Sequence, residues 1–137
     1  MKKLLPLMII LLFISNMSCK KAIENKEKQL LLAAITDGTW FVQQYVEGAT
    51  DITGTFTNYN FKFYDNDKVI GVIFTDTTSG TWSGDIANSS ITSQFPTASD
   101  PVKKLNGIWK LTTTYTNYVE AEMNTSNGKN ILHLQKN

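Results

Sequence analysis

The chain has 137 residues, with 13 basic residues, 12 acidic residues and one cysteine, and its formal net charge is +1 at pH 7. All of the basic residues are lysines, so the chain lacks the planar guanidinium group that grips phosphates and carboxylates at two points. This balance offers no broad positive surface for nucleic acid, and the single cysteine excludes an internal disulfide.

Residues 1–18 have the three-part layout of a bacterial export signal. Lys2 and Lys3 precede an apolar stretch from Leu4 to Ile14, and Ser18 supplies a small residue at a cleavage site. The apolar stretch is too short for a membrane anchor, because a helix needs about 20 residues to cross a bilayer. We therefore predict a signal peptide whose removal leaves 137 − 18 = 119 residues, enough for one domain with a core.

The predicted cleavage site, Ser18-Cys19-Lys20-Lys21, resembles the lipobox of Bacteroidetes-type lipoproteins, although Asn16 stands where most lipoboxes carry an aliphatic residue. In those proteins the cysteine after the cut receives lipid. The resemblance implies that palmitate or a similar acyl chain on Cys19 anchors the protein in the outer membrane, on either its periplasmic or its surface face. The alternative is an ordinary signal peptide that is cut nearby and leaves Cys19 as a free thiol.

Residues 19–36 are expected to form a tether with a short helix. The first half of this segment is charged, and the second half, from Leu30 to Ile35, has a composition that favours a helix. We expect the helical half to pack against the domain that follows, and the alternative is that it lies on the membrane surface.

Residues 37–137 are rich in threonine, aromatic and β-branched residues, and glycine, asparagine and aspartate interrupt them at short intervals, which is typical of β-strands. Tight turns are expected at 65–68, 78–80 and 127–128, and a looser segment is expected at 96–107. The expected strands are 39–47, 56–64, 69–75, 81–86, 90–95, 108–116, 118–125 and 130–136. This pattern predicts an all-β domain, an antiparallel up-and-down meander that closes into a small barrel without exposed edges.

Alternation along the strands predicts which side chains face the interior. In the first strand we expect Trp40 and Val42 on one face, and Phe41 and Tyr45 on the other. In the strand 108–116 the alternation places Trp109 and Tyr115, among others, on one face.

Three Gly-x-Trp tripeptides, at 38–40, 80–82 and 107–109, stand where a turn is expected to meet a strand. Each glycine is expected to let the backbone bend, and each tryptophan to cap the barrel interior. The first tripeptide resembles the motif that opens the first strand of lipocalins. With 58–63, 79–83, a proline-containing loop, 105–109 and 131–134, it resembles the small lipocalin-like domains of Bacteroidetes lipoproteins. Lipocalins proper pack an arginine across the first tryptophan, and Lys136 would be a poor substitute for it.

The resemblance implies a barrel that can bind a small apolar or amphipathic molecule. The expected inward-facing candidates are Trp40, Phe61, Phe63, Trp82, Trp109 and Tyr115. The alternative is that these rings form the core of a filled barrel without a ligand, because small barrels can be filled by their own side chains. The protein would then be a structural or protein-interaction module of the outer membrane.

The sequence indicates no enzyme, cofactor or metal site. The one histidine, His133, is expected on the outer face of the last strand, and a surface histidine is favoured over a metal ligand or a catalytic base. Asp65-Asn66-Asp67 is expected to form a turn rather than to bind calcium. Asp76-Thr77-Thr78 resembles the motif at which exported Bacteroidetes proteins receive an O-linked sugar, which makes Thr77, in a predicted turn, a candidate for glycosylation.

Overall fold

The computed structural model describes the backbone of residues 5–137 and the side chains of residues 20–137. The side chains on which the signal peptide and the lipidation of Cys19 depend lie outside these described residues. The elements of the first half are α1 (Leu5–Thr36), β1 (Trp40–Glu47), β2 (Thr50–Asp51), the 3₁₀ helix η1 (Thr53–Phe56), β3 (Tyr59–Phe63) and β4 (Lys68–Ile73). Those of the second half are β5 (Asp76–Asp85), β6 (Ser90–Gln94), the 3₁₀ helix η2 (Val102–Leu105), β7 (Gly107–Tyr115), β8 (Tyr118–Thr125) and β9 (Gly128–Lys136).

The helix α1 contains the predicted helical segment and is longer than expected. The chain divides into two compact units, of which the first ends at Leu31 and the second extends from Leu32 to Asn137. In the first unit the side chains of residues 20–30 are exposed. In the second unit the last turn of α1 buries Ile35, which is 4 % exposed, in the core. Within the described part of the chain, no helix combines the length and apolarity that a membrane span requires.

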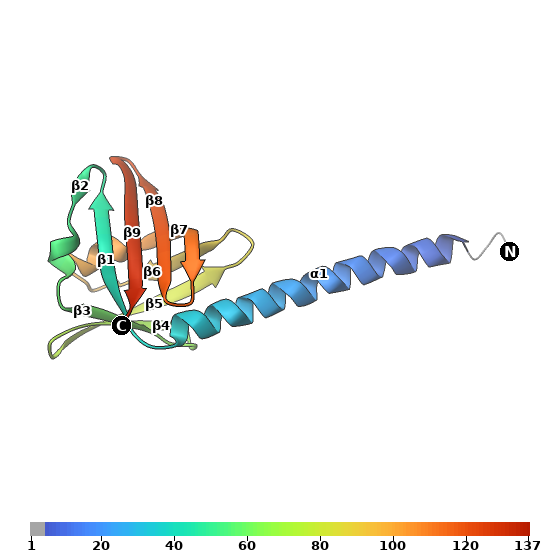
Figure 1. Cartoon of the computed structure of the whole chain (residues 1–137), viewed down its shortest axis with the longest axis horizontal. Helices are drawn as coiled ribbons and strands as arrows, with labels where there is room; N and C mark the ends of the chain where they lie inside the picture. Colours follow the sequence, from blue (N-terminus) through green and yellow to red (C-terminus); the bar gives the residue numbers. More distant parts are fainter. Residues whose placement is uncertain (1–4) are drawn as a thin grey trace. The chain divides into compact units, whose positions relative to one another are not determined.

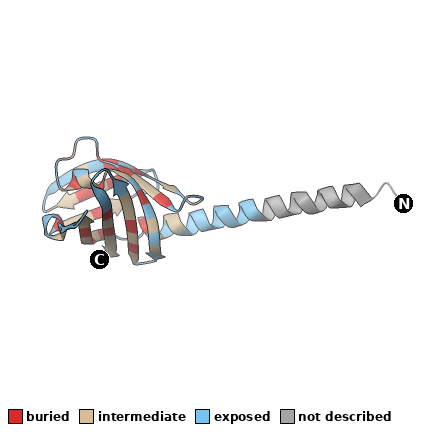
Figure 2. Ribbon diagram, turned by 90° about the horizontal axis from the view of Figure 1, so that it is seen from above, coloured by how far each residue is buried: buried red, intermediate tan, exposed pale blue. Residues whose placement is uncertain are grey.

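Eight strands form a closed antiparallel barrel, as the sequence predicts (Figure 1). Each strand from β3 to β9 pairs with its neighbour in the chain, and β9 returns to pair with β1 over seven residue pairs. The short strand β2 extends the β1 hairpin beside the barrel and was not predicted. Buried residues, red in Figure 2, alternate along the strands with intermediate or exposed ones, tan and pale blue. The alternation shows that one face of the sheet forms the core.

The barrel wall is uneven, because β1 and β3 share a single residue pair, Trp40 with Phe61. Every other pair of neighbours in the closed ring has at least four such pairs. The loop that contains η1 fills the space beyond this point, where Ile52 donates its backbone N–H to the carbonyl of Tyr45 at 2.9 Å. We call this weakly paired boundary the β1–β3 seam.

The antiparallel connections define two ends of the barrel. At the helix end, α1 leads into β1, and short turns at 64–67, 86–89 and 116–117 join the strands. At the loop end lie the longer connections 48–58 and 95–106, with η1 and η2, and the tight turns 74–75 and 126–127.

Two predicted boundaries are wrong. The strand expected at 56–64 begins only at Tyr59, because Phe56 ends the 3₁₀ helix η1. The turn expected at 78–80 lies instead at Phe74–Thr75, so that Thr77 and Gly80 belong to the strand β5.

The glycines of the Gly-x-Trp tripeptides have two different roles. Gly38 and Gly107 have φ angles of +75° and +127°, so they bend the backbone as expected. Gly80 lies inside β5, where an added Cβ would be 2.5 Å from the carbonyl oxygen of Gln94 and 2.7 Å from the ring of Phe95. The second tripeptide therefore marks a close packing contact and not a turn.

Two β-bulges reverse the predicted alternation. The register of β1 shifts between Val42 and Gln44, and this turns Tyr45 into the core, where it is 0 % exposed. The register of β7 shifts between Leu111 and Thr113. Because one extra residue moves every later side chain to the opposite face, Tyr115 lies outside the barrel and is 66 % exposed. The predictions that Tyr45 faces away from Trp40 and that Tyr115 faces inward are both wrong.

Candidate functional site

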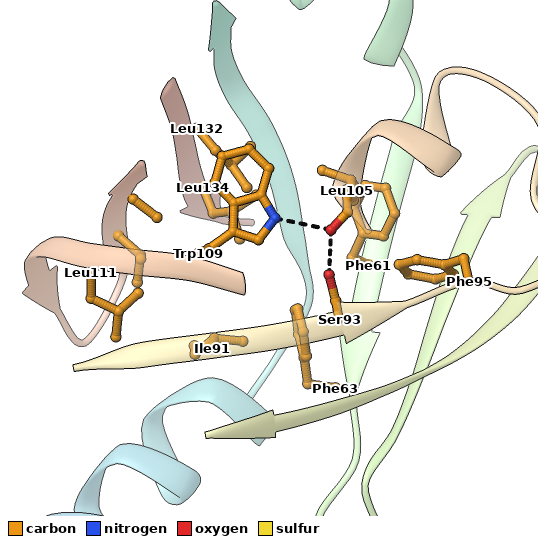
Figure 3. Close-up of a pocket in the computed structure, with 12 residues that line it drawn as sticks. Phe61, Phe63, Ile91, Ser93, Phe95, Leu105, Trp109, Leu111, Leu132 and Leu134 are labelled. Carbon is orange, nitrogen blue, oxygen red and sulfur yellow. Dashed lines mark hydrogen bonds between the residues drawn. The ribbon is translucent and has the colours of Figure 1, made fainter. Parts of the chain in front are cut away.

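An apolar pocket occupies the barrel interior (Figure 3). Its volume is about 50 Å³. The side chains that line it come from five strands, η2 and the loop before η2: Phe61, Phe63, Ile91, Ser93, Phe95, Leu105, Trp109, Leu111, Val119, Ala121, Leu132 and Leu134.

The polar groups of the lining are occupied within the protein. The Ser93 hydroxyl and the Trp109 indole N–H both donate to the carbonyl oxygen of Leu105, the latter at 2.9 Å (Figure 3). This shared acceptor fixes η2 against β6 and β7. Among the described residues, no buried side-chain nitrogen or oxygen lacks a hydrogen-bond partner. The pocket therefore offers dispersion and apolar contact, and no free polar group that would orient a ligand.

The pocket is closed at the loop end and opens toward the helix end. Phe95 and Leu105, next to the long loop, are buried at 2 % and 6 % exposure. Four lining residues are only half-buried: Phe63, Ile91 and Leu134 near the helix end, and Leu111 midway along β7. Phe63 ends β3, Ile91 is the second residue of β6, and Leu134 lies near the end of β9. These four side chains form the mouth of the pocket.

The size of the pocket limits what it can hold. An engineered apolar cavity of about 150 Å³ is known to accept one benzene molecule. At about 50 Å³ this pocket is smaller, so in the present side-chain arrangement it does not enclose a ligand of that size. A ligand can place only its apolar tip inside, and the remainder has to lie at the mouth.

Three of the six predicted ligand-binding residues line the pocket, and these are Phe61, Phe63 and Trp109. Trp82 is not part of the lining but contacts one of its members: the Trp82 ring is edge-on to the Phe63 ring, with 5.5 Å between the ring centres. The Trp82 indole N–H donates to the carbonyl oxygen of Tyr64 at 2.9 Å. Tyr115 takes no part, because the bulge in β7 places it outside.

Trp40 packs against the end of α1 and does not line the pocket. Its indole N–H donates to the carbonyl oxygen of Ile35 at 2.9 Å. The Lys136 ammonium lies 5.0 Å from the centre of the Trp40 ring and donates to the carbonyl oxygen of Ala34 at 2.9 Å. Lys136 thus lies across the first tryptophan, in the place for which the sequence suggested it as a poor substitute for arginine.

A second lysine completes this arrangement, which we call the lysine socket. The Lys62 ammonium donates to the carbonyl oxygens of Thr36 and Gly38 at 2.5 and 3.0 Å. With Lys136 and the Trp40 indole, it supplies hydrogen bonds to the carbonyl groups at the C-terminus of α1, which have no partners within the helix. The positive charges also lie at the negative end of the helix dipole.

The loop end is closed by aromatic packing and polar contacts around Tyr45. The Tyr45 ring stacks on Phe56 at 5.3 Å and meets the edge of Trp109 at 5.8 Å, and its hydroxyl donates to the carbonyl oxygen of Lys104 at 2.8 Å. Burial, reinforced by the nearby Glu47 carboxylate, raises the pKa of Tyr45 to about 12. The Lys104 ammonium lies 2.6 Å from Glu47, which raises the pKa of Lys104. Tyr45 is the main core residue that the sequence analysis missed.

His133 lies on the outer face of β9, as predicted, and it has partners that the sequence could not reveal. The Tyr118 hydroxyl lies 2.8 Å from Glu120 Oε1 and 3.1 Å from His133 Nδ1, while His133 Nε2 lies 4.0 Å from the same carboxylate oxygen. The hydrogen bond from Tyr118 lowers the pKa of Glu120. Within residues 20–137, no three histidine, cysteine, aspartate or glutamate side chains are grouped closely enough to hold a metal ion.

Asp65 to Asp67 lie in the turn between β3 and β4, as predicted. Thr77, the candidate for O-glycosylation, lies near the start of β5 rather than in a turn, and it is exposed.

No protein family matches the sequence, and no curated protein matches it significantly. Among solved structures, the chain is similar to a DUF4847 family protein from Bacteroides vulgatus, with a TM-score of 0.59 and 16 % sequence identity. The similarity covers 78 % of this chain and 97 % of the other. At this level of identity the comparison shows a shared barrel fold.

Proposed function

We propose that this protein is a lipid-anchored lipoprotein of the outer membrane whose barrel binds the apolar end of a small amphipathic molecule. The observation that carries the proposal is the pocket, which has an apolar lining with no free polar group and opens at one end of the barrel. Burial of an apolar chain end against such a lining is favourable by about 25 cal/mol per Å² of surface removed from water. A polar headgroup would stay outside, because nothing in the lining could replace its hydration.

The binding proposal is tested with dodecanoate that carries bromine at its terminal carbon, because bromine quenches tryptophan fluorescence on contact. Trp109 lines the pocket, so we expect saturable quenching in the purified protein. Ala121→Leu fills the pocket and should abolish the quenching. Ala49→Leu, at an exposed position of the loop end, is the matched control and should bind like the parent protein. Absence of saturable quenching in the parent protein would exclude binding of the dodecanoate chain in the pocket.

A second function is favoured by the small volume of the pocket. A filled barrel would act through its outer surface, as a structural or protein-interaction module of the envelope. In that case Ala121→Leu should raise the melting temperature by filling space, and no brominated amphiphile should quench Trp109. Crosslinking in intact cells should then recover a specific protein neighbour.

The membrane anchor is tested separately. Growth with labelled palmitate should label the parent protein, and the Cys19→Ala variant should be neither labelled nor retained in the outer-membrane fraction. Protease treatment of intact cells then assigns the periplasmic or the surface face. An intact mass without an added hexose would exclude glycosylation at Thr77.

A further inference from the structure

The mouth of the pocket and the point where α1 joins the barrel lie at the same end. Phe63, Ile91, Leu111 and Leu134 surround the mouth, and the strand β1 begins at this end, directly after α1. The end of the barrel that is joined to the predicted tether is therefore also the end at which half-buried apolar side chains surround an opening.

Tyrosine rings stand at the ends of two strands on this side. Tyr64 directly follows β3 and is 39 % exposed, and Tyr115 is the last residue of β7 and is 66 % exposed. Tyrosine is favoured where one part of a side chain contacts hydrocarbon and its hydroxyl contacts water, as at a membrane interface. These two tyrosines, which we call the tyrosine rim, have the side-chain chemistry of a surface that contacts lipid headgroups.

The lysine socket attaches the chain firmly at this end. The Lys62 and Lys136 ammonium groups and the Trp40 indole bind the carbonyl oxygens of Ala34, Ile35, Thr36 and Gly38, so the last turn of α1 does not separate freely from the barrel. The anchored chain therefore enters the barrel at a fixed position beside the mouth.

The charges at the helix end define the kind of lipid. In the second unit, the exposed carboxylates at this end are those of Asp37, Asp65, Asp67 and Asp85. They outnumber the one exposed lysine here, Lys68, because the ammonium groups of Lys62 and Lys136 are bound to carbonyl oxygens. Exposed carboxylates are repelled by anionic headgroups. This end suits a zwitterionic surface better than an anionic one.

We propose that the helix end of the barrel rests on the membrane in which the protein is anchored, with the acyl chains of a zwitterionic phospholipid facing the mouth of the pocket. This inference rests on the proposed function, because it takes the lipid on Cys19 as the anchor and the apolar pocket as the binding element. It goes further by naming the ligand source as the bilayer and the contact surface as the helix end.

The test uses the lipidated full chain in phosphatidylcholine vesicles whose acyl chains carry bromine. A fluorophore is attached to a single new cysteine, in either Asn117→Cys or Asn127→Cys, since lipid occupies the sulfur of Cys19. Asn117 lies in the turn before β8 and Asn127 in the turn after it, so the two exposed positions mark opposite ends of one strand. We expect the label at the helix end to lose about half of its fluorescence and the label at the loop end to lose none, as contact with the interface requires.

Three results would overturn the inference. Equal quenching of both labels would mean that the barrel lies on its side, and quenching of the loop-end label alone would assign lipid contact to the exposed Phe74 and Ile108. Quenching of neither label would mean that the barrel is held away from the bilayer. In all three cases, binding of brominated dodecanoate in water reports on the proposed function independently.

The tyrosine rim provides a second measurement. The double variant Tyr64→Ser, Tyr115→Ser changes exposed side chains only, so the barrel should fold normally. It should reduce quenching of the Asn117→Cys label in vesicles without changing the binding of brominated dodecanoate in water. Unchanged quenching in vesicles would show that the rim does not contact lipid.

Discussion

The two ends of the barrel differ in how they close. At the loop end, η1 and η2 cover the interior, and the buried Tyr45 links Phe56, Trp109 and the backbone of Lys104. At the helix end, short turns leave the pocket open, and cations hold the end of α1. Long loops thus provide closure at one end, and the absence of such loops provides access at the other. The position of the mouth follows from loop length rather than from any single residue.

The largest expected effect comes from removing the centre of the loop end. Tyr45→Ala deletes a ring that is 0 % exposed together with its hydrogen bond to Lys104. The free energy of unfolding should fall by about 4 kcal/mol, measured by urea denaturation.

Tyr115→Ala is the matched control at the helix end, because it removes the same side chain from a position that is 66 % exposed. It should change the free energy of unfolding by less than about 0.5 kcal/mol. Similar losses for the two variants would contradict the assignment of Tyr45 to the core and Tyr115 to the surface.

The next effect is a loss of stability in alkali that depends on Tyr45. Its pKa is about 12 in the folded protein and 10.0 as the reference value, so the stabilising contribution is complete below pH 10 and is lost as the pH rises toward 12. A shift of this size corresponds to about 3 kcal/mol. Urea denaturation at several pH values should show a steeper decline for the parent protein than for Tyr45→Phe, and parallel curves would exclude this role.

A smaller effect is expected at the lysine socket. Lys136→Met retains an apolar side chain of similar length but removes the ammonium donor to Ala34 and the cation over the Trp40 ring. The loss of a charged hydrogen bond should lower the free energy of unfolding by about 2 kcal/mol.

The control for the socket is Lys129→Met, which removes a half-exposed ammonium in the ion pair with Glu122. It should change stability by less than about 1 kcal/mol. If both lysine variants lose the same amount, the socket does not hold the end of α1 as described.

The smallest effect concerns the outer face of the barrel. The hydrogen bond from Tyr118 lowers the pKa of Glu120, so its contribution to stability is present above the ordinary pKa of glutamate and is lost as the pH falls through the lower folded value. Glu120→Gln should therefore flatten the dependence of the melting temperature on pH below about 4.5. An unchanged acid profile would show that the carboxylate does not contribute.

Much of the barrel could be predicted because its strands carry clear local patterns. In β8 and β9, apolar residues such as Val119, Ala121 and Leu132 alternate with polar ones, and the turn before Gly128 contains asparagine. These features act over a few residues and can be read without knowledge of the tertiary structure. The fold class and the outward position of His133 followed from them.

The failures come from features that no local pattern marks. The bulges in β1 and β7 contain no glycine to reveal them, yet they reversed the faces of Tyr45 and Tyr115. The turn at Phe74–Thr75 lacks typical turn residues and holds Phe74 at a φ of +53°. Gly80 suggested a turn, but it is a glycine because a Cβ at this position would collide with the backbone of Gln94 and the ring of Phe95.

The candidate site could be predicted only in part, since Phe95 and Leu105 reach it from outside the strands. Both flank the loop that contains Pro96 and Pro101, and the sequence gives no indication that this loop folds back over the interior. The volume of the pocket also depends on how all of the rings pack, which the identity of the residues does not determine.

The β1–β3 seam has a consequence for how the molecule moves. A ring of strands separates first where the fewest backbone hydrogen bonds must break together, and this boundary has one residue pair against seven on the opposite side of β1. The barrel wall therefore opens most readily between β1 and β3, at the side where β2 and η1 follow β1. Its opening would enlarge the interior from the side, and amide hydrogen exchange would detect it as faster deuterium uptake at Tyr59 and Phe61 than at Val119 and Ala121.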